Sequence, residues 1–147
     1  MKIIVLQGNS GTGKTTTIRK VFQKIFESSG KIIEHQNEGG KHEVDFKAHL
    51  LYKAQHVFFY SHGDSCDYLN AAIDQFRTYQ NVFNAQFRSV LICSYNLDLK
   101  GKARDPMNRI ISASTYKLID KSVHANGNIE EQMKLNELDA EKIFSLI

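Results

Sequence analysis

A glycine-rich segment near the N-terminus carries the side chains best suited to chemistry, since residues 8–15 read Gly-Asn-Ser-Gly-Thr-Gly-Lys-Thr. Glycines permit a tight turn that aims backbone N–H groups at anionic oxygens, and a helix beginning near Gly13 adds the positive end of its dipole. Lys14 can reach the β- and γ-phosphates of a nucleotide, and Thr15 can offer a hydroxyl to Mg²⁺. The segment predicts a phosphate-binding loop made of Gly8, Asn9, Ser10, Gly11, Thr12, Gly13, Lys14, Thr15 and Thr16.

The strands and helices around this loop can be predicted from the hydrophobic periodicity. The apolar run Lys2–Leu6 predicts a strand leading into the loop, and apolar residues at helical spacing predict a helix from about Lys14 to Ser28. Residues 31–34 then predict a short second strand, and the polar stretch 36–41 predicts a loop. Strands that alternate with helices favour a mainly parallel sheet with helices on its faces.

The middle of the chain predicts a β-hairpin, a helix and another strand. Residues 44–52 alternate between apolar and polar types, and the continuous apolar run 56–61 is typical of a buried strand. Together they predict a hairpin that adds an antiparallel strand to the sheet. A helix is expected from about Ser65, and residues 89–95 predict a further buried strand.

The C-terminal part predicts an edge strand and short helices. The strand is expected over residues 114–122, after a short helix at 107–112 that Asp105-Pro106 would begin. Asn128 can cap one later helix and Asp139 can cap a last one, because both side chains accept hydrogen bonds from the free N–H groups of a first turn.

A carboxylate near Mg²⁺ is the next requirement of phosphoryl transfer, and Asp64 is the first candidate. It follows the apolar run 57–60, and ligands of open α/β sheets lie at the carboxyl ends of strands. Residues 61–63 separate it from that run, however, and Asp64 could equally cap the helix that follows. Asp67 is a weaker substitute, and Asp45 is a second candidate if the loop before it folds over the phosphates.

A basic loop after the strand 89–95 supplies positive charge. Phosphoryl transfer commonly recruits an arginine to the developing negative charge, and Arg104 is our choice for that role. The same loop carries Lys100, Lys102 and Arg109. The catalytic set expected from the sequence is therefore Lys14, Asp64 and Arg104, with Thr15 and Asp64 as ligands of Mg²⁺.

Residues 8–15 fit the pattern GxxxxGK[ST] at every fixed position, and in this the chain resembles the P-loop NTPase superfamily. The resemblance implies an α/β fold, a three-layer αβα sandwich whose mainly parallel sheet has one antiparallel hairpin strand, and a Mg-nucleotide bound through Gly8–Thr15. The chain also resembles small bacterial and phage ATP-binding proteins in which a strand ends in Ser-x-Gly-Asp, here Ser61–Asp64. The guanine-recognition motifs of GTPases are absent at 59–63 and 95–98, which favours ATP over GTP.

Composition predicts one domain spanning residues 1–147. Of the 147 residues, 41% are hydrophobic, enough for a continuous core, and no apolar run has the length of a membrane span. We expect a soluble, cytoplasmic protein in which Cys66 and Cys93, which lack CxxC spacing, are reduced and Cys93 lies in the core. A formal charge of +3 is too small and dispersed to indicate a nucleic-acid-binding surface.

Four histidines recur every seven residues, a regular spacing that could suggest a metal site. In a strand an odd spacing alternates faces, and Gly39-Gly40 interrupts any helix, so histidines spaced by seven cannot all share one face. We therefore expect no metal site among His35, His42, His49 and His56. His62, at the end of the strand 56–61, could orient water or a phosphoryl acceptor.

These features favour a Mg-dependent ATP-binding enzyme, either an ATPase or a small kinase-like phosphotransferase. The alternative is a nucleotide-dependent switch or partner-binding module, for which GTP also fits; the Gly39-Gly40 loop and the lack of a second clear catalytic motif favour it. A nucleic-acid-dependent ATPase rests only on the basic loop 100–109. The sequence identifies neither a phosphoryl acceptor nor a protein partner.

Overall fold

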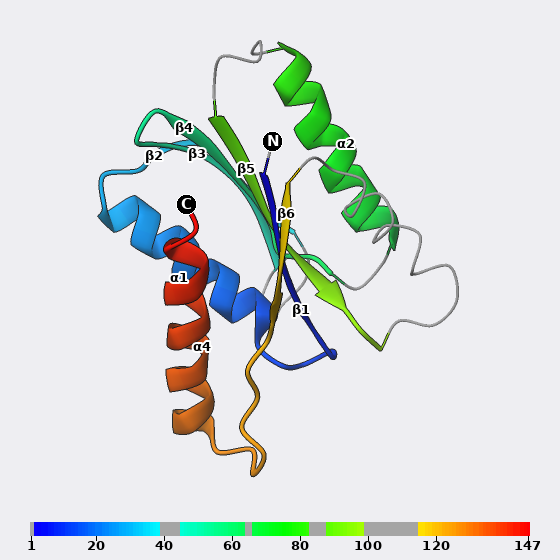
Figure 1. The fold of residues 1–147 in the computed structure, drawn as a ribbon, viewed down its shortest axis with the longest axis vertical. Coiled ribbons are helices and arrows are strands. Elements are labelled where there is room, and N and C mark those ends of the chain that lie inside the picture. Colours follow the sequence, from blue (N-terminus) through cyan, green and yellow to red (C-terminus); the bar gives the residue numbers. More distant parts are fainter. Residues whose placement is uncertain (1, 39–44, 64–65, 83–87, 99–114) are drawn as a thin grey trace.

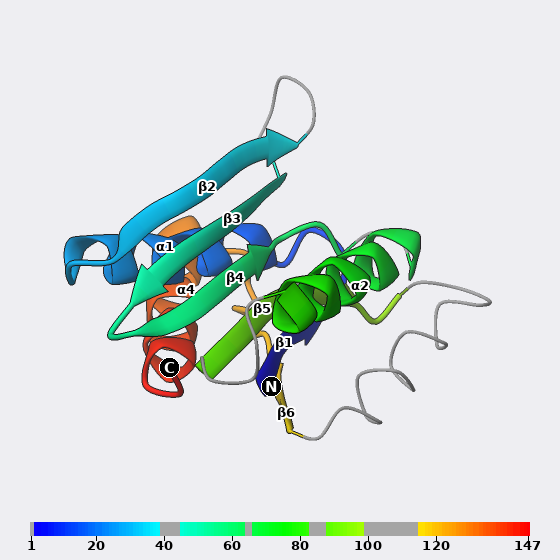
Figure 2. The ribbon, with the colours of Figure 1, turned by 90° about the horizontal axis from the view of Figure 1, so that it is seen from above.

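A six-stranded mixed sheet forms the centre of the structure, a computed structural model that describes residues 2–38, 45–63, 66–82, 88–98 and 115–147. The strands are β1 (Lys2–Gly8), β2 (Lys31–Glu38), β3 (Asp45–Tyr52), β4 (Gln55–Tyr60), β5 (Arg88–Asn96) and β6 (Tyr116–Asp120). Their order is β2-β3-β4-β5-β1-β6 (Figure 2). β3 pairs antiparallel with both β2 and β4, and the other neighbouring strands pair in parallel.

Helices cover both faces of the sheet. α1 (Lys14–Glu27) and α4 (Ile129–Phe144) lie on one face, and α2 (Cys66–Val82) lies on the other (Figures 1 and 2). Side chains alternate along β1 accordingly: Ile4 and Leu6 pack with α1 and α4, whereas Ile3 and Val5 pack with α2. Both faces of β1 are thus buried, and the loop that follows it leaves from a strand that lies between two layers of helices.

Most of the predicted elements are confirmed, and β2 differs in length. The hairpin of β3 and β4 turns at Lys53 and Ala54, which both adopt positive φ, and β6 is an edge strand as expected. β2 continues to Glu38, through polar residues that were expected to form a loop, because residues 36–38 pair with residues 45–47 of β3. An edge strand tolerates polar side chains, since one of its sides faces solvent. The predicted helix at 107–112 lies outside the described residues.

The prediction that Asp139 caps a separate last helix is wrong. A single helix, α4, runs from Ile129 to Phe144, and Asn128 caps it by accepting hydrogen bonds from the N–H groups of Glu130 and Glu131. Asp139 lies inside this helix and is fully buried. Its carboxylate accepts hydrogen bonds from Lys121 and Ser122, which follow β6, so the charge is compensated without a break in the helix.

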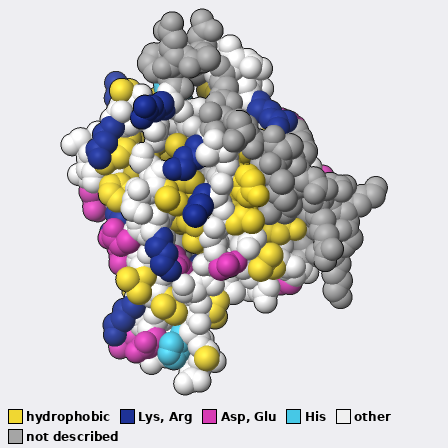
Figure 3. Space-filling model, in the orientation of Figure 1, with side chains coloured by type: hydrophobic (Ala, Val, Ile, Leu, Met, Phe, Trp, Pro, Cys, Tyr) yellow, Lys and Arg dark blue, Asp and Glu magenta, His cyan; other side chains and the backbone are white. Residues whose placement is uncertain are grey.

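Ion pairs join α4 to α1 across their exposed sides. Lys20 contacts Glu137 at 2.8 Å, and Lys24 contacts both Glu137 and Glu141 at 2.6 Å. Hydrogen bonds from Glu137 and Glu141 raise the pKa of Lys24 to about 12. Figure 3 views the side of the molecule on which β6 and α4 lie, where basic, acidic and hydrophobic side chains are all exposed.

Two buried polar groups behave as core residues. Cys93 on β5 is fully buried, and burial raises the pKa of its thiol to about 12, which makes it an unreactive core residue as predicted. His49 on β3 stacks on Phe58 at 4.1 Å between ring centroids, and its Nε2 lies 2.8 Å from Nδ1 of His56. His35 packs on the opposite face against Phe22, which agrees with the expectation that the four histidines do not all share one face.

We predict that His49 makes the stability of the protein depend on pH. Burial, and then the charge of His56, lower the pKa of His49 to about 4 from 6.5. Between these values the unfolded chain binds a proton that the folded chain does not, so stability falls as pH falls, by up to about 1.4 kcal/mol per pH unit. Urea unfolding at pH 7 and pH 5 should show this loss in the wild type and a smaller loss in His49→Phe. Equal losses in both proteins would contradict the assignment.

Candidate functional site

A polar cleft lies at the edge of the sheet where β1, β4 and β5 end and the antiparallel strand β3 begins. Its volume is about 240 Å³. One wall is the glycine-rich loop (residues 8–15) with the start of α1, and the other walls come from the ends of three strands and the segments next to them. The lining residues are Ser10, Gly11, Gly13, Lys14, Thr15, Thr16, Asp45, Ser61, Gly63, Ser94 and Asn96.

The glycine-rich loop turns directly into α1. Gly13 takes φ +84° and precedes Lys14, the first residue of the helix. An L side chain rarely adopts this conformation, so glycine is required here for the chain to enter the helix. The turn leaves the first N–H groups of α1 at the cleft, where they can bind an anion.

Lys14 is tied to the loop that precedes it. Its Nζ donates to the carbonyl oxygen of Gly8 at 3.0 Å and to that of Asn9 at 2.6 Å, and the residue is 6% exposed. Thr12 also donates to the Asn9 carbonyl, at 2.8 Å. Gly8, Asn9 and Thr12 therefore hold the loop together, and the ammonium group of Lys14 is fixed within it.

Asp45 connects the loop to the far wall of the cleft. Its Oδ1 accepts hydrogen bonds from the hydroxyl of Thr15 at 2.7 Å and from that of Ser61 at 2.9 Å. The Ser61 hydroxyl in turn accepts the N–H of Phe46 at 2.8 Å, which continues the pairing of β3 with β4 beyond the end of β4. A hydroxyl, a carboxylate and a second hydroxyl are thus held together beside Lys14.

His62 and Ser94 stand next to this group. Nε2 of His62 lies 4.0 Å from Oδ2 of Asp45, and both side chains are about one-fifth exposed, at 21% and 20%. The hydroxyl of Ser94 on β5 donates to the carbonyl of Ser61 at 2.6 Å. The bond from Ser94 holds the residues that follow β4 against β5, and His62, which does not line the cleft itself, lies beside Asp45.

Asp98, after β5, contacts the other side of the loop. The N–H of Ser10 donates to both carboxylate oxygens of Asp98, at 3.2 and 3.1 Å. The N–H of Leu97 donates to the carbonyl of Gly8 at 3.1 Å. The segment after β5 is therefore hydrogen-bonded to the start of the glycine-rich loop.

The structure brings together most of the residues predicted from the sequence. Lys14, Thr15 and Thr16 meet at the cleft, and the carboxylate beside Thr15 is Asp45, the second candidate. Asp64 and Arg104 lie outside the described residues. Sequence reasoning missed Ser94, Asn96 and the contact of Asp98 with the loop. Their position directly at the end of a buried parallel strand was the available signal.

The described residues contain no cluster of three or more His, Cys, Asp or Glu side chains that could hold a metal ion by themselves. Any divalent cation at Asp45 would need further ligands from a bound phosphate or from water.

None of the helices in the described part of the chain is both long and apolar enough to cross a membrane. Comparison with models of protein families, with curated proteins and with solved structures found no match to this chain.

We predict that Ser61 supports the site through two hydrogen bonds. Ser61→Ala removes the acceptor for the buried N–H of Phe46 and a donor to Asp45, so the free energy of unfolding should fall by about 1–3 kcal/mol in urea titrations. Ser28→Ala, at the exposed end of α1, is the matched control and should change stability by less than about 0.5 kcal/mol. A Ser61→Ala variant as stable as this control would show that the network is not formed.

Proposed function

We propose that the protein binds Mg-ATP in the cleft and acts on its terminal phosphate, by hydrolysis or by transfer to an acceptor. The observation that carries this proposal is the hydrogen bond between Thr15 and Asp45 beside a glycine-rich loop. The hydroxyl and the carboxylate are ligands for a hard cation. They lie next to the N–H groups of the loop and the ammonium group of Lys14, which are ligands for phosphate.

The donor set fits Mg²⁺. Two neighbouring ligands of an octahedral Mg²⁺ ion lie about 3.0 Å apart when each is about 2.1 Å from the metal. The oxygens of Thr15 and Asp45 are 2.7 Å apart, so both could contact one ion with little movement. When bound, Mg²⁺ would neutralise charge on the phosphates. Thr15 and Asp45 would hold it, and Ser61 would orient the Asp45 carboxylate.

The loop supplies the groups that would hold the phosphates. The first N–H groups of α1 provide hydrogen-bond donors and the positive end of a helix dipole. Lys14 adds a full charge, and its contacts with Gly8 and Asn9 keep this charge at the cleft. In this proposal His62, whose Nε2 lies 4.0 Å from Oδ2 of Asp45, would orient a water molecule or an acceptor hydroxyl.

The preference for ATP over GTP rests on the absence of the guanine-recognition motifs at residues 59–63 and 95–98. Both oxygens of Asp98 accept the N–H of Ser10, which joins this carboxylate to the glycine-rich loop. The segment after β5 thus acts as a support for the loop in this proposal.

Lys14→Ala should abolish Mg-ATP binding, because it removes the cation that faces the phosphates. In calorimetry we expect the affinity to fall by at least about 100-fold, a loss of about 2.7 kcal/mol. Lys20→Ala, further along the same helix, is the matched control and should bind like the wild type. Unchanged affinity in Lys14→Ala, or no binding by the wild-type protein, would overturn the proposed function.

Asp45→Asn should separate the effect of the metal from that of the phosphates. With Mg²⁺ present, we expect ATP to bind about tenfold more weakly, because a carboxylate ligand is lost. Without Mg²⁺, the variant should bind ATP at least as well as the wild type, since the substitution removes a negative charge that repels the triphosphate. Asp74→Asn, exposed on α2, is the control. A loss of affinity that does not depend on Mg²⁺ would contradict the assignment of Asp45.

A further inference from the structure

Helix α4 and the residue after β6 press against both ends of the glycine-rich loop. A Cβ atom placed on Gly8 would lie 2.9 Å from Cβ of Lys121. A Cβ atom on Gly13 would lie 3.0 Å from Oδ1 and 3.2 Å from Nδ2 of Asn136. The side chains of Lys121 and Asn136 therefore lie directly on the loop backbone, with no room for another atom between them.

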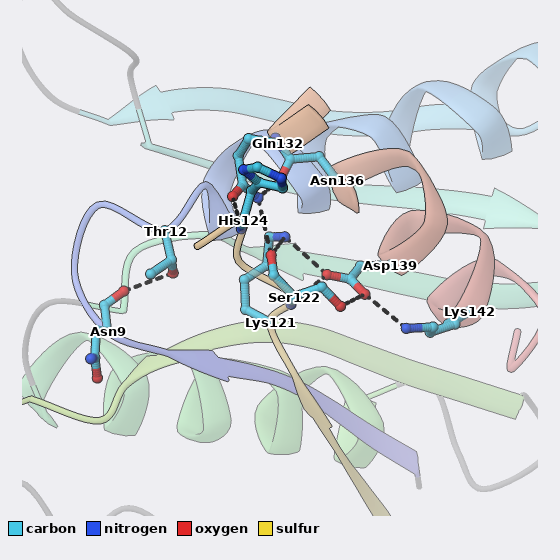
Figure 4. Close-up of polar contacts among 9 residues, drawn as sticks. All are labelled: Asn9, Thr12, Lys121, Ser122, His124, Gln132, Asn136, Asp139 and Lys142. Carbon is cyan, nitrogen blue, oxygen red and sulfur yellow. Dashed lines mark hydrogen bonds and ion pairs between the residues drawn. The ribbon is translucent and has the colours of Figure 1, made fainter. Parts of the chain in front are cut away.

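A buried ion pair fixes these contacts in place (Figure 4). Nζ of Lys121 lies 2.9 Å from Oδ2 of Asp139, and both side chains are 0% exposed. The N–H and the hydroxyl of Ser122 each donate to Asp139 at 2.8 Å, and Lys142 donates to it at 3.0 Å. Burial opposes the ionisation of Asp139, but the hydrogen bonds from Lys121, Ser122 and Lys142 hold its pKa below the usual value. A buried pair with this many partners holds one geometry.

Gln132 fixes the orientation of Asn136. Its Nε2 donates to Oδ1 of Asn136 at 3.1 Å and to the carbonyl of Ser122 at 3.0 Å, and its Oε1 accepts the N–H of His124 at 2.9 Å (Figure 4). Gln132, which is itself hydrogen-bonded to the segment after β6, thus orients the amide of Asn136 that lies on Gly13.

The buried side of α4 is apolar near the C-terminus of the helix and polar near the glycine-rich loop. Toward its C-terminus it buries Ala140 and Ile143, which pack in the core. Toward the loop it buries Asn136, which is 5% exposed, and Asp139. Packing alone favours apolar side chains at such positions, because a buried polar group is costly unless its hydrogen bonds are made. A buried amide against Gly13 indicates a requirement for fixed orientation.

We propose that Asn136 is a positioning residue that holds Gly13, and with it the first N–H groups of α1, where a phosphate would bind. The effect on ligand affinity rests on the proposed binding of Mg-ATP, whereas the effect on the loop does not. Small displacements of a binding group are costly. The loss of this contact should therefore change both the mobility of the loop and the affinity for Mg-ATP.

Asn136→Ala can be tested against Lys134→Ala, a truncation at an exposed position of the same helix. Hydrogen exchange, followed by mass spectrometry without nucleotide, should be about tenfold faster for the amides of residues 9–17 in Asn136→Ala and unchanged in Lys134→Ala. Peptides from residues 138–147 should exchange as in the wild type. In calorimetry, Mg-ATP should bind about tenfold more weakly to Asn136→Ala alone.

The outcomes separate the two proposals. Wild-type exchange of the loop in Asn136→Ala would overturn the positioning role, and so would equal effects of both variants. Failure of the wild type to bind Mg-ATP would overturn the proposed function alone. If all amides of Asn136→Ala exchange faster, the isosteric variant Asn136→Asp is used in its place. In that variant the amides of the loop should still exchange slowly. Mg-ATP should bind more weakly to it, because a negative charge then lies against Gly13. Unchanged affinity in that variant would contradict the contact.

Discussion

The placement of β1 between two strands that run parallel to it is the constraint on which the site depends. Ile3, Ile4, Val5 and Leu6 are fully buried, so the loop that follows them leaves from a buried strand that has a parallel neighbour on each side. Backbone pairing continues past the strand ends, because the N–H of Leu97 donates to Gly8 and that of Lys121 donates to Gln7. The segments after β5 and β6 therefore flank the glycine-rich loop on both sides.

The two walls of the cleft have complementary chemistry. On one side, Lys14 and the N-terminus of α1 favour an anion; on the other, the Asp45 carboxylate favours a cation. Asp45 accepts hydrogen bonds from the hydroxyls of Thr15 and Ser61, and Lys14 donates to loop carbonyls. A ligand that carries both signs, such as a metal-bound polyphosphate, can replace these contacts without leaving a buried charge uncompensated.

The sequence predicted those parts of the structure that are determined by residue types close together in the chain. The glycine-rich loop, the hairpin and the cap at Asn128 follow from residue type and spacing. The hairpin register also carries information about Asp45: Lys47 pairs with Tyr60, so two residues further along Asp45 must lie beside His62. Contacts between distant elements could not be predicted in this way. Aspartate is a residue type that often caps helices. Only the position of Lys121 in the fold shows that Asp139 instead forms a buried ion pair with it.

A crystal structure with Mg²⁺ and a non-hydrolysable ATP analogue is the most direct test of the proposed ligand site. We expect Mg²⁺ about 2.1 Å from the hydroxyl oxygen of Thr15, with the Asp45 carboxylate bound to it directly or through one water molecule. We also expect phosphate oxygens on the N–H groups at the start of α1. A triphosphate bound elsewhere, or Mg²⁺ held without any contribution from Asp45, would contradict the proposal.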